Sequence, residues 1–327
     1  MTRTRSILRA RGPLRIPKRN RAFLLALVAL VAGACGRAPE PDAPQADDGL
    51  ARPPFVRVES PGGPRLFLLG TLHAGPADGW RFSPEIERVI STADTLVMEI
   101  DLAALDPDTV ASATAERVIL QDGKRLPDVL SPETNAVLDA RDADLAAVGL
   151  TARARSLYEP WFLFVGLSEL VVQRSNLDLR ASAEAAILAR FRGQETLALE
   201  TFLFQLDMLD GMPLSLQDLM LRDALERLDE ADEDLIELVD AWRRADRPRL
   251  IEEARAGIDE HPGLEQVYER ILDDRNAAWI GKLEAIARDR TREEQTVLVA
   301  VGALHLVGEK GVPALLEQAG YTVTRIH

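Results

Sequence analysis

The chain has 327 residues, of which 46% are hydrophobic and 28% are charged. This composition excludes a disordered or fibrous protein and provides enough apolar material for one large domain or two modest ones. The formal net charge of −14 at pH 7 makes nucleic acid a poor partner, because its phosphates repel an acidic surface.

The first 34 residues differ from the rest of the chain. They contain eight basic residues and no acidic one, and they include an apolar stretch at residues 22–32. A basic segment followed by an apolar run that is too short to span a bilayer is typical of a signal peptide rather than of a transmembrane helix. Without this segment the chain keeps 31 basic and 53 acidic residues, a formal charge of −22. We therefore predict that residues 1–34 are a signal peptide.

The only cysteine follows this segment directly. The run Val31-Ala32-Gly33-Ala34-Cys35 resembles the lipobox of bacterial lipoproteins. The alternative is ordinary cleavage near Ala34, which would leave a free thiol as a reactive liability, so lipidation of Cys35 is favoured. The mature protein is then expected outside the cytoplasm, anchored to a membrane by Cys35, and in the outer membrane or periplasm of a host with two membranes. Residues 35–52, rich in Pro and Asp, are predicted to form a disordered tether.

The domain after the tether is predicted to open with a β-hairpin. Its strands cover residues 55–59 and 65–70, and the run Pro61-Gly62-Gly63-Pro64 supplies the turn. Ser83-Pro84-Glu85 combines an N-cap, a proline at the first helical position and an early acidic residue, which predicts a helix start. Because this helix leads into an apolar strand at residues 95–98, we expect a βαβ unit.

Between about residues 103 and 290 the apolar positions recur at helical spacing, which predicts a large, mostly helical insertion. Helices are expected to begin at Pro132 and to cover residues 160–172, 181–191, 214–242 and 264–287. A short apolar strand at residues 195–200 interrupts this insertion.

The C-terminus is predicted to contain a strand at residues 296–302, a helix at 312–319 and a strand at 321–326. A short helix between two apolar strands favours parallel pairing of those strands. The predicted fold class is therefore α/β, with a central sheet split between the N- and C-terminal segments of one domain at residues 53–327.

Two of the four histidines share a local sequence. The apolar run Leu66-Phe67-Leu68-Leu69 precedes Gly70-Thr71-Leu72-His73, and a second apolar run precedes Gly302-Ala303-Leu304-His305. An apolar run that ends at Gly is typical of a buried strand, so each histidine is expected just beyond a strand end. A single histidine is usually a structural residue, but two in matching GxxH segments favour a function.

Two further apolar strands end in carboxylates, Glu99 and Glu200. Because the carboxyl ends of parallel strands meet at one edge of a sheet, we expect both carboxylates there with His73 and His305. An isolated buried carboxylate is costly, so a cation must lie close to each one: an Arg such as Arg275, a metal ion or a substrate amine.

Two neutral imidazoles with one or two carboxylates suit a divalent ion such as Mn²⁺, Co²⁺, Zn²⁺ or Fe²⁺, with a position left for water. The glutamate that is not a ligand would take the proton of that water as it attacks an amide or ester carbonyl. Asp101 is predicted to hold an imidazole N–H. Arg275 and Asn276, on one predicted helix, either bind a substrate carboxylate or an oxyanion, or form a polar clasp between helix and sheet.

These segments resemble the TraB/GumN family, which is related to the Tiki metalloproteases. The resemblance is carried by GTLH at residues 70–73, Val97-Met98-Glu99, Leu199-Glu200-Thr201, residues 301–308, Gly320-Tyr321-Thr322-Val323 and, more weakly, Arg275-Asn276. It covers roughly residue 55 to the end, and it implies an EreA/ChaN-like α/β fold. For a Tiki-type member it also implies a metal-dependent peptidase whose GxxH histidines and a glutamate are essential. Asn176-Leu177-Asp178 stands where the family usually has Gly-x-Asp, which leaves the conformation of that loop open.

Three functions follow from these observations. The first is a membrane-tethered extracytoplasmic hydrolase, most concretely a metal-dependent peptidase acting on a peptide or a small amide or ester. The second is a metal-independent, esterase-like hydrolase in which His73 or His305 is the general base. The third is a lipoprotein that binds a ligand or peptide without turnover. Metal content separates the first from the second, and turnover separates both from the third.

Overall fold

The structure is a computed structural model that describes residues 48–101, 104–147 and 149–327. The predicted signal peptide, Cys35 and residues 36–47 of the predicted tether lie outside the described residues. In the described part of the chain, no helix combines the length and the apolar character needed to cross a membrane. Ala51, near the end of the predicted tether, is 1% exposed, and its backbone is hydrogen-bonded to Arg81 and Ser83 at 2.8 and 3.0 Å.

The centre of the fold is a six-stranded sheet of order β4-β3-β5-β2-β1-β6. Its strands are β1 (Phe55–Glu59), β2 (Arg65–Thr71), β3 (Thr95–Met98), β4 (Glu195–Ala198), β5 (Thr296–Gly302) and β6 (Thr322–Arg325). Strands β4, β3, β5 and β2 are parallel, and β1 and β2 form the predicted antiparallel hairpin. Because β5 comes from the C-terminal segment and lies between β3 and β2, the prediction of an α/β fold with a split sheet is confirmed.

The predicted parallel pairing of the last two strands is wrong. Strand β6 pairs antiparallel with β1, so β2 and β1 separate it from β5. The helix between them, α15 (Val312–Gln318), buries Val312 and Leu316 in the same apolar cluster as Val56 and Leu68 of the hairpin. Since α15 packs on the hairpin strands, the chain emerges beyond β1 and adds its last strand there.

The helices confirm the predicted insertion. Between β2 and β3 lies α1 (Pro84–Thr92). Between β3 and β4 lie α2 (Pro107–Arg117), α3 (Leu126–Val129), α4 (Pro132–Ala140), α5 (Asp142–Ala147), α6 (Ala152–Arg155), α7 (Pro160–Arg174), η3 (Leu179–Ala181) and α8 (Ala183–Arg190). Between β4 and β5 lie α9 (Phe202–Asp210), α10 (Leu214–Glu226), α11 (Ala231–Arg243), α12 (Arg247–Ala254), α13 (Leu264–Tyr268), η4 (Glu269–Asp273), α14 (Asp274–Ala287) and η5 (Arg290–Arg292).

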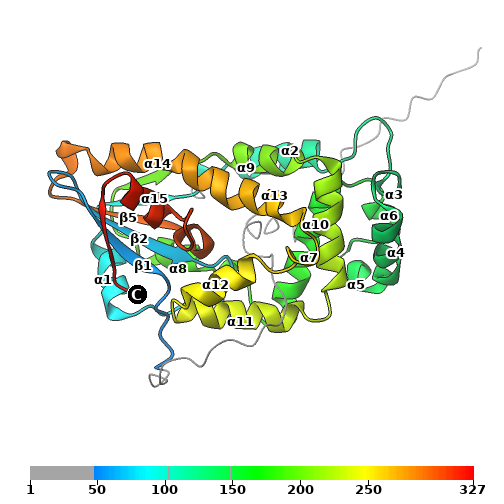
Figure 1. The fold of residues 1–327 in the computed structure, drawn as a ribbon, viewed down its shortest axis with the longest axis horizontal. Helices are drawn as coiled ribbons and strands as arrows, with labels where there is room; N and C mark the ends of the chain where they lie inside the picture. The colour runs from blue at the N-terminus through cyan, green and yellow to red at the C-terminus, as the bar shows by residue number, and fades with distance from the viewer. Residues whose placement is uncertain (1–47, 102–103, 148) are drawn as a thin grey trace, which may run out of the picture.

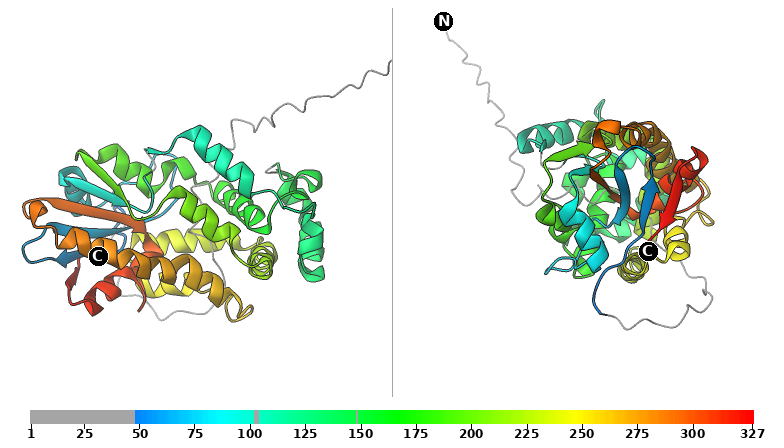
Figure 2. Two further views of the ribbon diagram at one scale, coloured as in Figure 1. Left: turned by 90° about the horizontal axis from the view of Figure 1, so that it is seen from above. Right: turned by 90° about the vertical axis from the view of Figure 1, so that its left-hand side faces the viewer.

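The sheet and the insertion form two ends of an elongated molecule. Figure 1 shows the sheet with α1, α14 and α15 at one end and α4, α5, α7 and α10 at the other, and the view from above in Figure 2 agrees. Helices α11 and α12 lie between the two ends. A buried tryptophan packs in each of three apolar clusters: Trp242 on the α1 face of the sheet, Trp161 in the insertion and Trp279 on α14.

Two predicted helices differ in detail. The predicted helix at residues 214–242 is two helices, α10 and α11, and the predicted helix at 264–287 contains the π-helical turn η4. A π turn inserts an extra residue into the helix and is frequent at functional sites. Here it precedes Arg275, Asn276 and Trp279, which are all buried on α14.

Candidate functional site

The carboxyl ends of the four parallel strands meet at one edge of the sheet. Each of these strands is followed within three residues by a predicted site residue: His73 after β2, Glu99 after β3, Glu200 after β4 and His305, in the short helix η6 (Ala303–Leu306), after β5. Helix α14 packs close to this edge and brings Arg275 and Asn276 to it. The predicted site residues of the described chain therefore come together.

Gly302 lies where three of these side chains converge. A β-carbon at this position would be 3.3 Å from Oε1 of Glu99, 3.5 Å from Cδ2 of His305 and 3.9 Å from Nε2 of His73. The backbone N–H of Gly302 donates to Oε1 of Glu99 at 2.8 Å. A β-carbon at the glycine of the second GxxH segment would therefore press on the Glu99 carboxylate, because it would occupy the space between the carboxylate and the two imidazoles.

His305 is held in one orientation by the helix beside it. Its Nδ1 lies 2.6 Å from Oδ1 of Asn276, and Nδ2 of Asn276 donates to the Lys310 carbonyl at 3.0 Å. Because the amide nitrogen is used in this way, Oδ1 accepts and Nδ1 of the imidazole is the donor. Nε2 therefore carries a lone pair; it accepts from Nη1 of Arg275 at 3.2 Å and lies 3.8 Å from Oε1 of Glu99.

His73 is arranged in the same way by a different residue. Its Nδ1 forms an ion pair of 2.9 Å with Oε1 of Glu184, a buried residue of α8. Its Nε2 is buried and has no hydrogen-bond partner among the residues that the structure describes. Both imidazoles thus face an oxygen acceptor with Nδ1 and turn Nε2 toward the space beside Gly302.

The two glutamates have different surroundings. Arg275, which is 1% exposed, donates from Nη2 to Oε2 of Glu99 at 2.5 Å and from Nε to Oε1 of Glu200 at 2.9 Å. Glu200 also accepts from Trp279 Nε1 at 2.6 Å and from Gln205 at 3.3 Å. Glu99 therefore keeps one oxygen, Oε1, toward the histidines, whereas both oxygens of Glu200 are occupied by donors on α9 and α14.

Burial and the charges of neighbouring side chains shift the pKa values of Glu99, His305 and His73. Burial alone would raise the pKa of Glu99, but the charge of Arg275, together with His305, His73 and the Gly302 N–H, outweighs burial and holds that pKa well below its usual range. Burial, with the charge of Arg275, lowers the pKa of His305 to about 3. Burial opposes the charge of His73, but the neighbouring Glu184 carboxylate raises its pKa to about 9. The Nε2–H of protonated His73 would then be a buried donor without an acceptor, which is costly.

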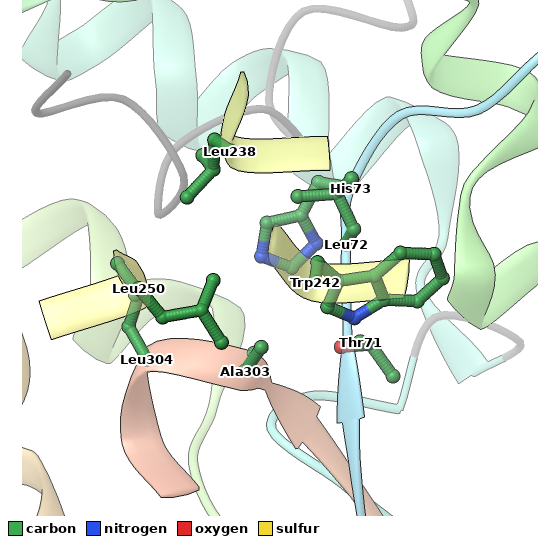
Figure 3. A pocket seen from close by; sticks show the side chains of 9 residues that line it. Thr71, Leu72, His73, Leu238, Trp242, Leu250, Ala303 and Leu304 are labelled. Carbon is green, nitrogen blue, oxygen red and sulfur yellow. The ribbon is translucent and has the colours of Figure 1, made fainter. Parts of the chain in front are cut away.

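A small cavity of about 20 Å³ opens beside His73 and Gly302. Its walls are apolar and come from three elements, with Leu238 and Trp242 on α11, Leu250 on α12 and Leu304 on η6. Figure 3 shows the His73 imidazole pointing toward the space between these side chains. The volume suits about one water molecule. Helices α11 and α12 of the insertion thus cover this edge of the sheet beside His73.

Sequence reasoning missed Glu184 and Lys310. The sequence contains a feature that points to Glu184: it lies on the face of α8 that also buries Ile187, where an apolar residue is the norm. Asp101, predicted to hold an imidazole, instead accepts from the backbone N–H of Ala104 at 3.2 Å. Arg275 and Asn276 have the contacts of the polar clasp, and a contact of either residue with substrate stays a prediction.

The side chains at this edge of the sheet can be compared with the ligands that a metal ion requires. Among the residues that the structure describes, no three His, Cys, Asp or Glu side chains form a ready-made metal site. The donor set nevertheless fits a metal ion in kind, because His73 has an orphaned buried Nε2, and His305 Nε2 and Glu99 Oε1 lie around the same glycine. To bind the ion, His305 Nε2 would exchange the hydrogen bond that it accepts from Arg275 for the metal. Imidazoles that bind a metal normally hold a carboxylate or carbonyl oxygen with their other nitrogen, as these two do.

Comparison with known proteins gives one finding. No curated protein and no solved structure has a significant match to the chain. The model of the TraB/PrgY/gumN family matches residues 54–325, which is nearly the whole of the described domain. The match includes both GxxH segments, both strand-end glutamates and Arg275 with Asn276. The chain therefore belongs to the TraB/PrgY/gumN family.

Proposed function

We propose that this protein is a metal-dependent hydrolase whose ion is held by His73, His305 and Glu99. The observation that carries the proposal is the matched pair of imidazoles, which face Glu184 and Asn276 with Nδ1 and turn Nε2 toward Gly302. Two imidazole nitrogens and one carboxylate are the ligand set of many catalytic zinc sites, which keep a fourth position for water. The orphaned Nε2 of His73 would gain a partner in the ion.

The residues around the ligands would each have a defined task. When bound, a divalent ion would acidify a water molecule and polarise a carbonyl oxygen. Glu184 and Asn276 would keep the imidazoles in the ligating orientation. The Gly302 N–H and Arg275 would hold the Glu99 carboxylate in place. The cavity beside His73 would take one water molecule, and its apolar walls would exclude bulk solvent.

Glu200 is assigned a positioning role rather than proton transfer. Both of its oxygens accept hydrogen bonds, from Arg275, Trp279 and Gln205, so a lone pair directed at substrate is not free. Its contacts fix the guanidinium of Arg275, which in turn holds Glu99. Of the two glutamates, Glu99 is therefore the proposed ligand and Glu200 the residue that orients Arg275.

The metal-independent alternative has less support from the surroundings of the histidines. A general base is most effective when its pKa lies near the working pH. Burial and Arg275 lower the pKa of His305 to about 3, and Glu184, against the effect of burial, raises the pKa of His73 to about 9. Neither imidazole on its own therefore has the pKa expected of a base at neutral pH.

The substrate class and the location are proposed on the sequence. A peptide or small amide or ester is the substrate implied by the resemblance to Tiki-type members. The basic segment, the apolar run and the lipobox-like residues before Cys35 support an extracytoplasmic protein tethered to a membrane. Loss of the protein from the membrane fraction in Cys35→Ser would support that tether.

The proposed ion is tested by metal analysis of a lipid-free chain that begins at Gly36, purified without chelator or affinity metal. The parent should carry close to one ion per chain, and His73→Ala and His305→Ala should lose it while keeping the circular dichroism spectrum of the fold. His261→Ala is the matched control, because His261 also pairs with a glutamate, Glu226, at 3.0 Å but on α10. Peptide-library cleavage by the loaded parent then tests the reaction.

Two results would reject the proposal. The first is absence of metal in the parent after incubation with Mn²⁺, Co²⁺, Zn²⁺ or, without oxygen, Fe²⁺. The second is equal metal content in the parent and in both site variants, which would place the ion elsewhere. Either result would leave the metal-independent hydrolase or the binding protein as the function to pursue.

A further inference from the structure

A second concave region lies at the opposite end of the sheet from the candidate site. It is a surface groove of about 750 Å³ between the β1–β2 hairpin, α1 and the first residue of β5. Strand β2 begins at this groove with Arg65 and ends at the candidate site with Thr71, and β5 runs in the same direction from Thr296 to Gly302. Seven residues of strand separate the two regions by about 20 Å.

The groove is basic although the chain is acidic. Arg57, Arg65 and Arg88 line it, together with one carboxylate, Glu59. Arg57 forms an exposed ion pair with Glu59 at 2.9 Å. Within the described residues, the guanidinium groups of Arg65 and Arg88 have no ion pair or hydrogen bond. Two uncompensated positive charges therefore face one groove on a chain with a formal charge of −14.

The floor of the groove is held rigidly. The Ser60 hydroxyl donates to the Ala287 carbonyl at the end of α14, and a β-carbon on Gly63 would lie only 1.9 Å from that carbonyl oxygen. The hairpin turn is thus fixed against α14. Phe67, half-buried in the groove, stacks on Phe55 with ring centroids 5.6 Å apart. An apolar surface therefore lies next to the arginines.

We propose that this groove binds the phosphate group of an anionic ligand. A guanidinium presents a planar fork of N–H donors that matches phosphate oxygens, and a phosphate dianion would neutralise the charges of Arg65 and Arg88. Phe67 would contact an apolar part of the ligand. The phosphate has two sources, a soluble phosphate compound or a phospholipid headgroup. The headgroup source agrees with the predicted anchor at Cys35, because the groove is built on the first hairpin after it.

The test uses the chain from Gly36 onward, which contains all three apolar clusters of the domain. Calorimetry with inorganic phosphate measures the soluble source. Sedimentation with vesicles of phosphatidylcholine, with and without phosphatidylglycerol, measures the headgroup source. The double variant Arg65→Gln/Arg88→Gln should lose about tenfold or more in affinity. Arg153→Gln/Arg244→Gln changes the net charge equally at two exposed arginines away from the groove and should bind as the parent does.

Each result has a defined meaning. Binding of inorganic phosphate that is lost in Arg65→Gln/Arg88→Gln supports the groove with a soluble ligand. Binding only to vesicles with phosphatidylglycerol, lost in the same variant, supports it with a lipid headgroup. Absence of both kinds of binding in the parent would overturn the proposal. An equal loss in the control variant would also overturn it, because the effect would then follow net charge and not the groove.

Discussion

Two regions of the molecule bury an arginine among carboxylates, but the distances from the guanidinium to those carboxylates differ between them. At the sheet edge, Arg275 is 1% exposed and lies 2.5 Å from Glu99 and 2.9 Å from Glu200. In the helical insertion, Arg227 is 9% exposed but lies 3.9 Å from Asp223 and 3.8 Å from Asp234. Neither Nη1 nor Nη2 of Arg227 has a hydrogen-bond partner among the described residues.

The difference follows from what holds the carboxylates. Glu99 and Glu200 stand at the ends of neighbouring parallel strands, β3 and β4, whose register is set by the ladder, so a single guanidinium on α14 reaches both. Asp223 and Asp234 lie on two helices that meet at a turn, and no shared ladder fixes their separation. Burying a charge costs free energy unless close partners compensate it. The sheet edge therefore has a compensated, preorganised site, and the insertion has a cluster that costs stability.

Loss of the central arginine should have the largest effect. Arg275→Met leaves Glu99 and Glu200 buried without a cation, so we expect the free energy of unfolding to fall by about 3–5 kcal/mol. Arg227→Met should change it by no more than about 1 kcal/mol, because Arg227 has no close ion pair. Urea unfolding of both variants measures the difference. If Arg227→Met proved as damaging as Arg275→Met, the contrast between the two regions would fail.

The next effect concerns the proposed ligands. Glu184→Gln keeps the size of the residue that faces Nδ1 of His73 but removes its charge. Loss of such a partner typically lowers metal affinity about 10–100-fold. Competition with a fluorescent chelator measures the affinity of the parent and the variant. Glu226→Gln, at the residue paired with His261, is the matched control and should leave metal affinity unchanged. Equal affinity in Glu184→Gln and the parent would remove His73 from the ligand set.

A smaller effect is expected at the glycine between the ligands. In Gly302→Ala the new methyl would lie 3.3 Å from Oε1 of Glu99, so the carboxylate must shift, at a cost of about 1–3 kcal/mol in stability. Gly281→Ala is the control, because that glycine of α14 has open space around its β-carbon position and should gain up to about 1 kcal/mol. Thermal unfolding compares the two. A stable Gly302→Ala with full metal content would show that the approach at Gly302 is not tight.

Local patterns in the sequence were sufficient to predict that the candidate site residues lie at one edge of the sheet, but not which side chains hold each of them in place. The GxxH segments and the strand-end glutamates each depend on a few neighbouring residues, and the sheet brought them together as expected. Arg275 was one of the cations that the sequence offered for Glu99, beside a metal ion or a substrate amine, and its place there depends on how α14 packs, 176 residues away. Glu184 reaches His73 through the packing of α8, and the placement of β6 depends on α15. Such contacts are set by tertiary packing, which periodicity does not encode.

The smallest effect should appear as pH dependence in the insertion. Burial raises the pKa of Glu253 from its usual 4.5 to about 7, although Arg249 opposes the shift. An acid whose pKa is higher in the folded than in the unfolded state binds a proton on folding, so its penalty is present above about pH 7 and fades as the pH falls toward 4.5. Glu253→Gln should therefore raise the free energy of unfolding by about 1–2 kcal/mol at pH 8 and by much less at pH 5. Equal gains at both pH values would mean that the pKa of Glu253 is the same in the folded and the unfolded states, and that the insertion is as well compensated as the sheet edge.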